Sequence, residues 1–220
     1  MKIIKLTGTI KLLSGLHIGG GDDTMKIGGI DNQVIKDINS DNPYIPGSSL
    51  KGKMRSLLEW DLGLVGFACG HPFSPKYING AFPQEKLDDA IHLMRLFGAS
   101  IVKDDEKVMK ERDITLGITR INVGDCALID KGLKTSEAKY ENVIDRQNGT
   151  AQHPRQTERV PAGVEFAYDI WLKVFDEKEE QKLKELIARG LELIENDYLG
   201  GNGSRGYGRV VFSNKNDWKE

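Results

Sequence analysis

The segment Gly47-Ser-Ser-Leu-Lys-Gly-Lys53 comes close to the glycine-rich loop that cradles phosphates in nucleotide hydrolases. That loop requires a Ser or Thr after its last lysine to hold magnesium, and Met54 stands at this position. The loop should also follow a buried strand, whereas only Tyr44 and Ile45 precede it here. These departures disfavour a nucleotide hydrolase.

The segment still favours a phosphate site, because it opens a predicted helix. The first turn of a helix offers free N–H groups and the positive end of the helix dipole. Lys51, Lys53 and Arg55 lie within the first turns and add positive charge. We expect them to hold one or two backbone phosphates of a polymer. The alternative is a helix capped by Ser48 or Ser49 with a solvated first turn.

Residues 200–208 form a second candidate site, with five glycines in nine positions. Glycine lets the backbone approach a ligand closely and adopts positive φ without steric cost, which suits Gly203 and Gly206. Arg205 supplies charge, and Tyr207 is expected to stack on a base. A structural turn between a helix and a strand is the alternative.

The charge is segregated along the chain, although the formal net charge is only −2. This balance argues against a protein that coats nucleic acid by bulk charge, but it permits a local basic groove. Solvated surface charge is the alternative for each cluster. The clustered basic residues are Lys51, Lys53 and Arg55; Arg146, Arg155 and Arg159; and Arg205 and Arg209.

The composition bounds the kind of protein that must position these residues. At 220 residues, 39% hydrophobic and 29% charged, the chain is typical of one globular domain. It contains no apolar run long enough to cross a membrane, and its first residues lack the apolar core of a signal peptide. Two cysteines cannot build a disulfide framework. We therefore expect a cytoplasmic protein with no membrane association.

Apolar periodicity predicts an α+β fold. Alternation predicts strands over residues 2–13, 116–123, 165–175 and 209–212, and helical spacing predicts helices over 49–61, 85–97 and 177–196. The glycine-rich stretch 14–47 is too long for a plain connection and is expected to be a functional loop or lid. Residues 135–163 are polar and are expected to form an exposed hairpin or arm.

Three motifs resemble the RAMP superfamily of CRISPR-associated proteins, and further motifs narrow the resemblance to the Cas7-like backbone subunit of the type III-A (Csm) effector complex. The first three span residues 16–20, 45–55 and 197–208. The narrower set consists of Gly29-Ile-Asp31, Arg95-Leu-Phe-Gly98, residues 140–146 and Pro154-Arg-Gln-Thr-Glu-Arg159.

The resemblance implies a single RAMP domain over residues 1–220. It would have a ferredoxin-like or RRM-like palm (1–13, 44–62, 114–134 and 164–212), a lid (14–43), a helical insertion (63–113) and a thumb hairpin (135–163). Copies would stack head to tail along a guide crRNA beside other Csm subunits. Complementary target RNA would be cut once per subunit.

The resemblance also implies roles for individual residues. Asp31 would be the cleaving residue, with a divalent metal such as Mg²⁺, and a carboxylate can accept a proton from the RNA 2′-hydroxyl or hold a hydrated ion that does so. The thumb arginines would lie where the hairpin wedges between bases. The residues expected on the RNA-facing motifs are His17, Gly19, Gly20, Lys53 and Arg55.

Relatives with a zinc site in the insertion suggest one more possibility. Cys69, His71 and His92 could supply three of four tetrahedral Zn²⁺ ligands, but no fourth ligand is evident. A buried cysteine and unliganded histidines are the alternative.

Three functions compete at this stage: an RNA-guided endoribonuclease subunit, an RNA-binding backbone without cleavage, and a guide-processing nuclease. Asp31 favours the first over the second, and the thumb-like arm favours either over the third.

Overall fold

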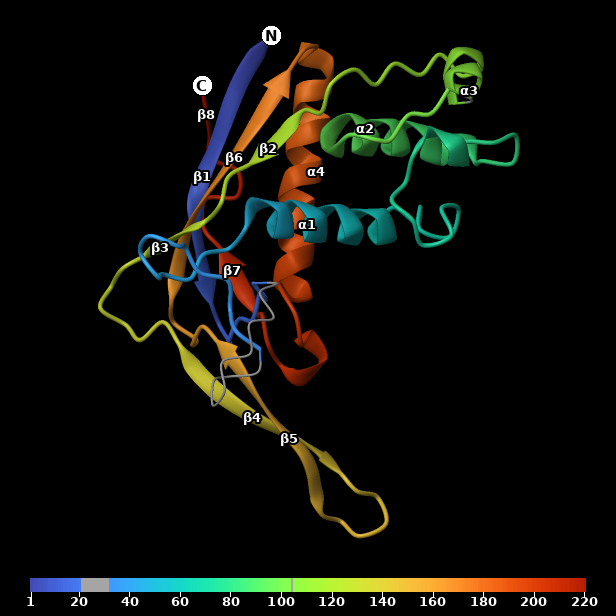
Figure 1. The fold of residues 1–220 in the computed structure, drawn as a ribbon. Coiled ribbons are helices and arrows are strands. Elements are labelled where there is room, and N and C mark those ends of the chain that lie inside the picture. Colours follow the sequence, from blue (N-terminus) through green and yellow to red (C-terminus); the bar gives the residue numbers. More distant parts are fainter. Residues whose placement is uncertain (21–31, 104) are drawn as a thin grey trace.

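The computed structural model describes residues 1–20, 32–103 and 105–220. A sheet with helices on one side forms the body, and a two-stranded hairpin projects away from it (Figure 1). The elements in chain order are β1 (Lys2–Leu12), α1 (Gly47–Asp61), η1 (Pro75–Tyr77), η2 (Gln84–Lys86), α2 (Leu87–Phe97), α3 (Asp105–Glu111), β2 (Ile121–Val123), β3 (Ala127–Ile129), β4 (Glu137–Ile144), β5 (Ala151–Arg159), β6 (Glu165–Val174), α4 (Glu177–Asn196), η3 (Gly203–Arg205), β7 (Val210–Phe212) and β8 (Trp218–Lys219).

The sheet runs in the order β2-β6-β1-β7 with antiparallel neighbours, and β3 and β8 pair with β6 and β1. Its spine is the β1–β6 ladder, from Lys2↔Val174 to Lys11↔Glu165. Alternate residues of β1, among them Leu6 and Ile10, are fully buried beneath the helices. In chain order these four strands are β1, β2, β6 and β7, and helices α1 and α4 follow β1 and β6; this is the ferredoxin-like arrangement and confirms the expected α+β palm.

The two palm helices, α1 and α4, cross closely because of a glycine. A Cβ built on Gly190 of α4 would lie 2.3 Å from Cγ of Met54 on α1. Met54 is fully buried at this crossing. Substitution at Gly190 would therefore force the helices apart or displace Met54.

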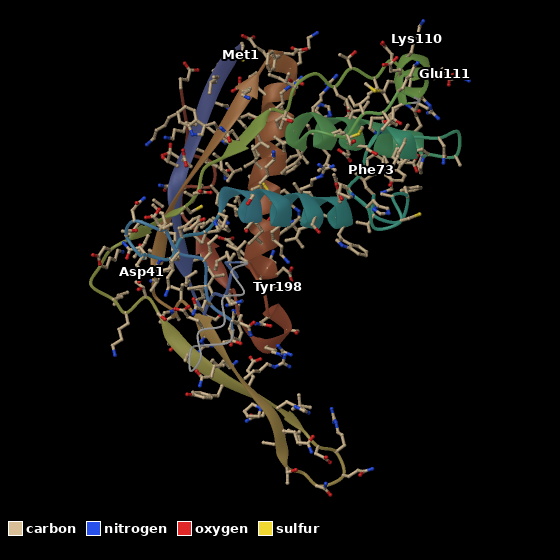
Figure 2. All side chains as sticks on the ribbon, in the orientation of Figure 1. Met1, Asp41, Phe73, Lys110, Glu111 and Tyr198 are labelled. Atoms are coloured by element: carbon tan, nitrogen blue, oxygen red, sulfur yellow. The ribbon has the colours of Figure 1, made fainter. Side chains whose placement is uncertain are left out.

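Buried charges fasten the helical insertion to the palm. Glu179, in the first turn of α4, lies 3.1 Å from Nε of Arg120 and 3.5 Å from Nη1 of Arg95 at the end of α2. On α1, Arg55 donates to Glu59 and to the carbonyl of Phe73, a fully buried residue between α1 and α2 (Figure 2).

Several predicted boundaries are wrong, for physical reasons. Residues before Ile121 are not strand, because Gly117 takes a φ of 69° and the backbone of Arg120 bonds to Arg95 at the end of α2. Helix α1 begins at Gly47 without a serine cap, since the Gly47 N–H donates to the Asp125 carboxylate at 2.8 Å. The segments α3, β3 and β8 are additional to the prediction.

The hairpin expected in residues 135–163 is present as β4 and β5. Its strands pair from Glu137↔Arg159 to Ile144↔Ala151, with a register shift between Glu141 and Val143. Most of its side chains are exposed, so the hairpin is held to the body mainly at its base.

Candidate nucleic-acid interface

A polar groove of about 290 Å³ opens at the base of the hairpin, where segments far apart in sequence meet. A second hollow of about 310 Å³ continues along the hairpin and shares Glu141, Arg155 and Arg205 with the groove. An open channel with few apolar walls suits a strand of a polar polymer better than a compact apolar ligand. The groove is lined by His17, Asn32, Glu141, Arg155, Thr157, Gly201, Asn202 and Arg205.

His17 joins the hairpin to the glycine-rich loop. Its Nδ1 lies 2.7 Å from the carbonyl oxygen of Glu158, and its own carbonyl accepts from the Gly201 N–H at 2.9 Å. A carbonyl can only accept, so Nδ1 carries a proton. The other ring nitrogen, Nε2, lies beside Gly19, 3.7 Å from a Cβ built there. The other predicted glycines of this motif, Gly19 and Gly20, are exposed beside it.

The carboxylate of Glu158 connects the lid segment to the base of the hairpin. Glu158 is buried, with 3% of its surface exposed. It accepts from the Val34 N–H at 3.0 Å and from Ser136 at 2.6 Å, and it pairs with Lys36 at 2.8 Å. Burial would raise its pKa, but these hydrogen bonds and the Lys36 charge outweigh burial and hold the pKa below its usual value.

The three hairpin arginines occupy different surroundings. Arg155 is exposed in the groove, and Arg146 is exposed in the turn at the hairpin tip; within the described residues neither has an ion pair. Arg159, at the base, donates to Glu137 at 2.6 Å. Only Arg155 among these predicted residues lines the groove.

The glycine-rich loop folds tightly against the rest of the molecule. A Cβ on Gly203 would lie 2.2 Å from the ring of Tyr198, the residue labelled at the end of α4 in Figure 2. Gly206 takes a φ of 82°, which favours glycine. Arg205 points into the groove and pairs with Glu141 at 3.2 Å.

The expectation that Tyr207 stacks on a base is wrong for this structure, because Tyr207 is 0% exposed. Lys139 and Arg159 lie over its ring at 4.5 and 5.1 Å, and its hydroxyl donates to Glu141 at 3.3 Å. Burial, with Glu141 next, raises the pKa of the hydroxyl. Tyr207 therefore has a structural role: its buried side chain packs the glycine-rich loop against the hairpin.

The cations of α1 do not form one phosphate cradle. Lys53 pairs with Asp197 at 2.6 Å and lies over the ring of Tyr198, whereas Arg55 is engaged with the insertion. Lys51 is half-buried; burial lowers its pKa, and the nearby charges of Arg55 and Lys173 lower it further. The N-terminus of α1 already binds the Asp125 carboxylate through the Gly47 N–H. The phosphate position expected there is therefore occupied by a side chain of the protein.

Asp31 lies outside the described residues. The residue after it, Asn32, is fixed in the groove: its backbone N–H donates to Gln156 at 3.4 Å, and its carbonyl accepts from the Glu158 N–H at 2.9 Å. The chain thus enters the described structure at the hairpin base immediately after the proposed catalytic position.

The zinc expectation finds no support in the described residues. Cys69 and His71 are both exposed, so the alternative of a buried Cys69 is also wrong, and Nδ1 of His92 bonds to the carbonyl of Asp88. Across residues 1–20, 32–103 and 105–220, no three His, Cys, Asp or Glu side chains gather as metal ligands. The residues present therefore do not fit a tetrahedral site.

Sequence reasoning missed the acidic partners of this interface. Glu158 lies within the motif of residues 154–159. Membership of that motif is the only sequence signal that could have identified it as part of the interface. Glu141 and Asp197 likewise lie inside predicted motifs, but only the basic, aromatic and glycine residues of those motifs were expected to bind RNA.

The chain is similar to known proteins in both sequence and fold. A profile of the RAMP superfamily matches residues 9–211. The chain is 38% identical to "CRISPR system Cms endoribonuclease Csm3" of Enterococcus italicus, covering 95% of this chain and 89% of the relative. It is 40% identical to the protein of the same name from Mycobacterium tuberculosis, covering 96% and 86%.

A solved structure, the Csm3-Csm4 subcomplex of the type III-A CRISPR-Cas interference complex, matches with a TM-score of 0.55 and 25% identity over 99% of this chain and 86% of that one. No helix of the described residues is both long and apolar enough to cross a membrane.

Proposed function

This chain belongs to the RAMP superfamily, and on that premise we propose that it is a repeating backbone subunit of a type III-A CRISPR effector complex, which binds a guide RNA and cleaves complementary target RNA. Relatives named as endoribonucleases match at 38–40% identity over nearly all of the chain. The observation that carries the proposal is the groove at the hairpin base, where Arg155, Arg205 and His17 meet beside the segment that follows Asp31.

Asp31 is the proposed catalytic residue. Its carboxylate would take a proton from the 2′-hydroxyl or hold a hydrated divalent ion such as Mg²⁺ there. One carboxylate offers few ligands, so water and RNA phosphates would complete the coordination. Cleavage would leave a 2′,3′-cyclic phosphate and a 5′-hydroxyl.

Partners follow from the same proposal. Guide crRNA and target RNA would run along the groove, further copies of this chain would stack head to tail, and other Csm subunits would complete the particle. The hairpin projects from one end of the body (Figure 1), so it can reach a neighbouring copy or its RNA.

The test is cleavage by the reconstituted complex. Guide-loaded complex with labelled complementary RNA and magnesium should give regularly spaced cuts, and Asp31→Ala or a chelator should abolish them while target binding persists. A 2′-deoxynucleotide at one cut position should block that cut alone. Target binding without cuts in the wild type would leave an RNA-binding backbone, and cuts in the guide precursor would indicate a guide-processing nuclease.

A further inference from the structure

Two of the cations along the groove and the adjoining hollow, Arg205 and Lys139, are already paired with a carboxylate of the chain itself. Arg205 Nη1 lies 3.2 Å from Glu141 Oε2, and Lys139 Nζ lies 3.6 Å from Glu141 Oε1. Lys53 on α1 is likewise paired with Asp197, which precedes the glycine-rich loop. Part of the positive charge expected to take RNA phosphates is therefore neutralised in the free chain.

Glu141 stands at the centre of this arrangement. It lines both hollows along the hairpin, and its side chain is 12% exposed. Its two oxygens meet a guanidinium, an ammonium and the Tyr207 hydroxyl. These are the donors that a phosphate oxygen would also select. On the neighbouring strand, Arg155 pairs in register with Glu141.

We infer that Glu141 takes the place of an RNA phosphate in the free chain and thereby limits the binding of arbitrary RNA. The inference rests on the proposed function, because it assumes that the groove receives an RNA strand. A phosphate that binds Arg205 must displace the Glu141 carboxylate. Each such contact therefore contributes less binding free energy, and releases fewer counterions, than a contact with an unpaired cation would. A strand held at many points by an assembled array can meet this cost, whereas a loosely bound RNA cannot.

The experiment measures fluorescence anisotropy of a labelled single-stranded RNA of mixed sequence with the purified full chain across a potassium chloride series. Glu141→Gln keeps the shape of the side chain and can still accept from Tyr207. We expect about two- to fivefold tighter binding at low salt, the range of one partly exposed ion pair. The slope of log affinity against log salt should steepen by about 0.7, the value for one further phosphate contact on a single strand.

The matched control is Glu192→Gln, which removes one carboxylate from an arginine pair on α4 (Arg189 Nη1 to Glu192 Oε2, 3.0 Å). It changes the net charge equally and should leave binding near the wild-type value. Equal tightening by both variants would reduce the effect to net charge and overturn the inference. Unchanged or weaker binding by Glu141→Gln, with circular dichroism showing a folded chain, would also overturn it.

A second pair of variants keeps the inference testable if Glu141→Gln does not fold. Because Arg205 is neutralised and Arg155 has no ion pair within the described residues, Arg155→Gln should lose more RNA affinity and more salt slope than Arg205→Gln. The reverse order would contradict the inference. If the wild-type chain binds no RNA even at low salt, the proposed function itself fails; salt-dependent wild-type binding with the wrong order of variants sinks only the role of Glu141.

Discussion

Glu158 is the residue on which the geometry of the groove most visibly depends. Its backbone holds Asn32 and His17, and its side chain holds Val34, Lys36 and Ser136. A buried carboxylate with three donors is favourable only while it is ionised. The stability of this part of the molecule should therefore depend on pH.

Glu158→Gln is expected to lower the free energy of unfolding at pH 7 by about 1–3 kcal/mol, since it leaves buried donors poorly paired. The folded-state pKa lies below the ordinary value of 4.5, so the wild-type advantage is present above pH 4.5 and is lost as pH falls through the folded pKa. Urea unfolding of both proteins, at neutral pH and below 4.5, measures the difference. A difference that does not change with pH would show that the charge of Glu158 is irrelevant.

Asp31 invites a comparison that separates its charge from the fold of the protein. Asp31→Asn keeps the shape of the side chain but cannot accept the 2′-hydroxyl proton, and we expect at least a hundredfold loss of target cleavage, in line with the usual contribution of a general base. Asp41→Asn is the control, because Asp41 lies in an exposed turn with a φ of 58°, which asparagine tolerates. Rates come from single-turnover assays of the assembled complex. Comparable rates in the two variants would remove Asp31 from the mechanism.

At the scale of the elements, the sequence predicted what is written in local periodicity. Helix α4 has the predicted bounds, and β1 and β6 each end one residue earlier, because burial on one face leaves a strong repeat in each. The hairpin and the glycine-rich loop were also predicted. The interactions that position the groove join residues far apart in sequence, such as His17 with Glu158 or Glu141 with Arg205, and no local pattern encodes such pairs.

Some of the predicted RNA-binding residues lie in the groove and others do not. Arg155, Arg205 and His17 do line a groove, because their motifs are brought together by β5 and by the loop after α4. Tyr207 does not, since an aromatic ring beside glycines can stack on a base or fill a core, and residue type alone cannot decide between them.

The two glycines of the loop offer a matched test. Gly203→Ala would place a methyl group 2.2 Å from the ring of Tyr198, so it should displace Tyr198 and, with it, Lys53 and Asp197. Gly206→Ala meets nothing within 4 Å and suffers only backbone strain, about 1–2 kcal/mol.

Both variants should melt at lower temperature, but Gly203→Ala should lose RNA affinity beyond what its stability loss explains. Parallel thermal melts and RNA titrations below the melting transition measure this difference. If both variants keep wild-type affinity while folded, the loop is a structural turn and not part of the RNA interface.

At the scale of the whole molecule, the distribution of charge and the shape both distinguish the two ends of the body. The chain is nearly neutral, yet its groove cations gather at the hairpin end of the body, while both termini lie at the far end of the sheet (Figure 1). Under the proposed function, copies of the chain stack head to tail, and a head-to-tail interface that does not close into a ring continues until something limits it. The guide RNA is the natural limit, because its length sets how many copies it can hold.

Assembly should accordingly depend on RNA length. The chain alone should remain small in size-exclusion chromatography with light scattering. With single-stranded guides of increasing length, the particle mass should rise in steps of one subunit, 24.5 kDa each. High salt should dissolve the particles, because each phosphate contact contributes about −0.7 to the slope of log affinity against log salt. Arg155→Gln, which removes an exposed groove cation, should shift this dissolution to lower salt, whereas Glu192→Gln should leave it in place. A mass that ignores RNA length, or particles that form equally well without RNA, would contradict head-to-tail assembly on a guide.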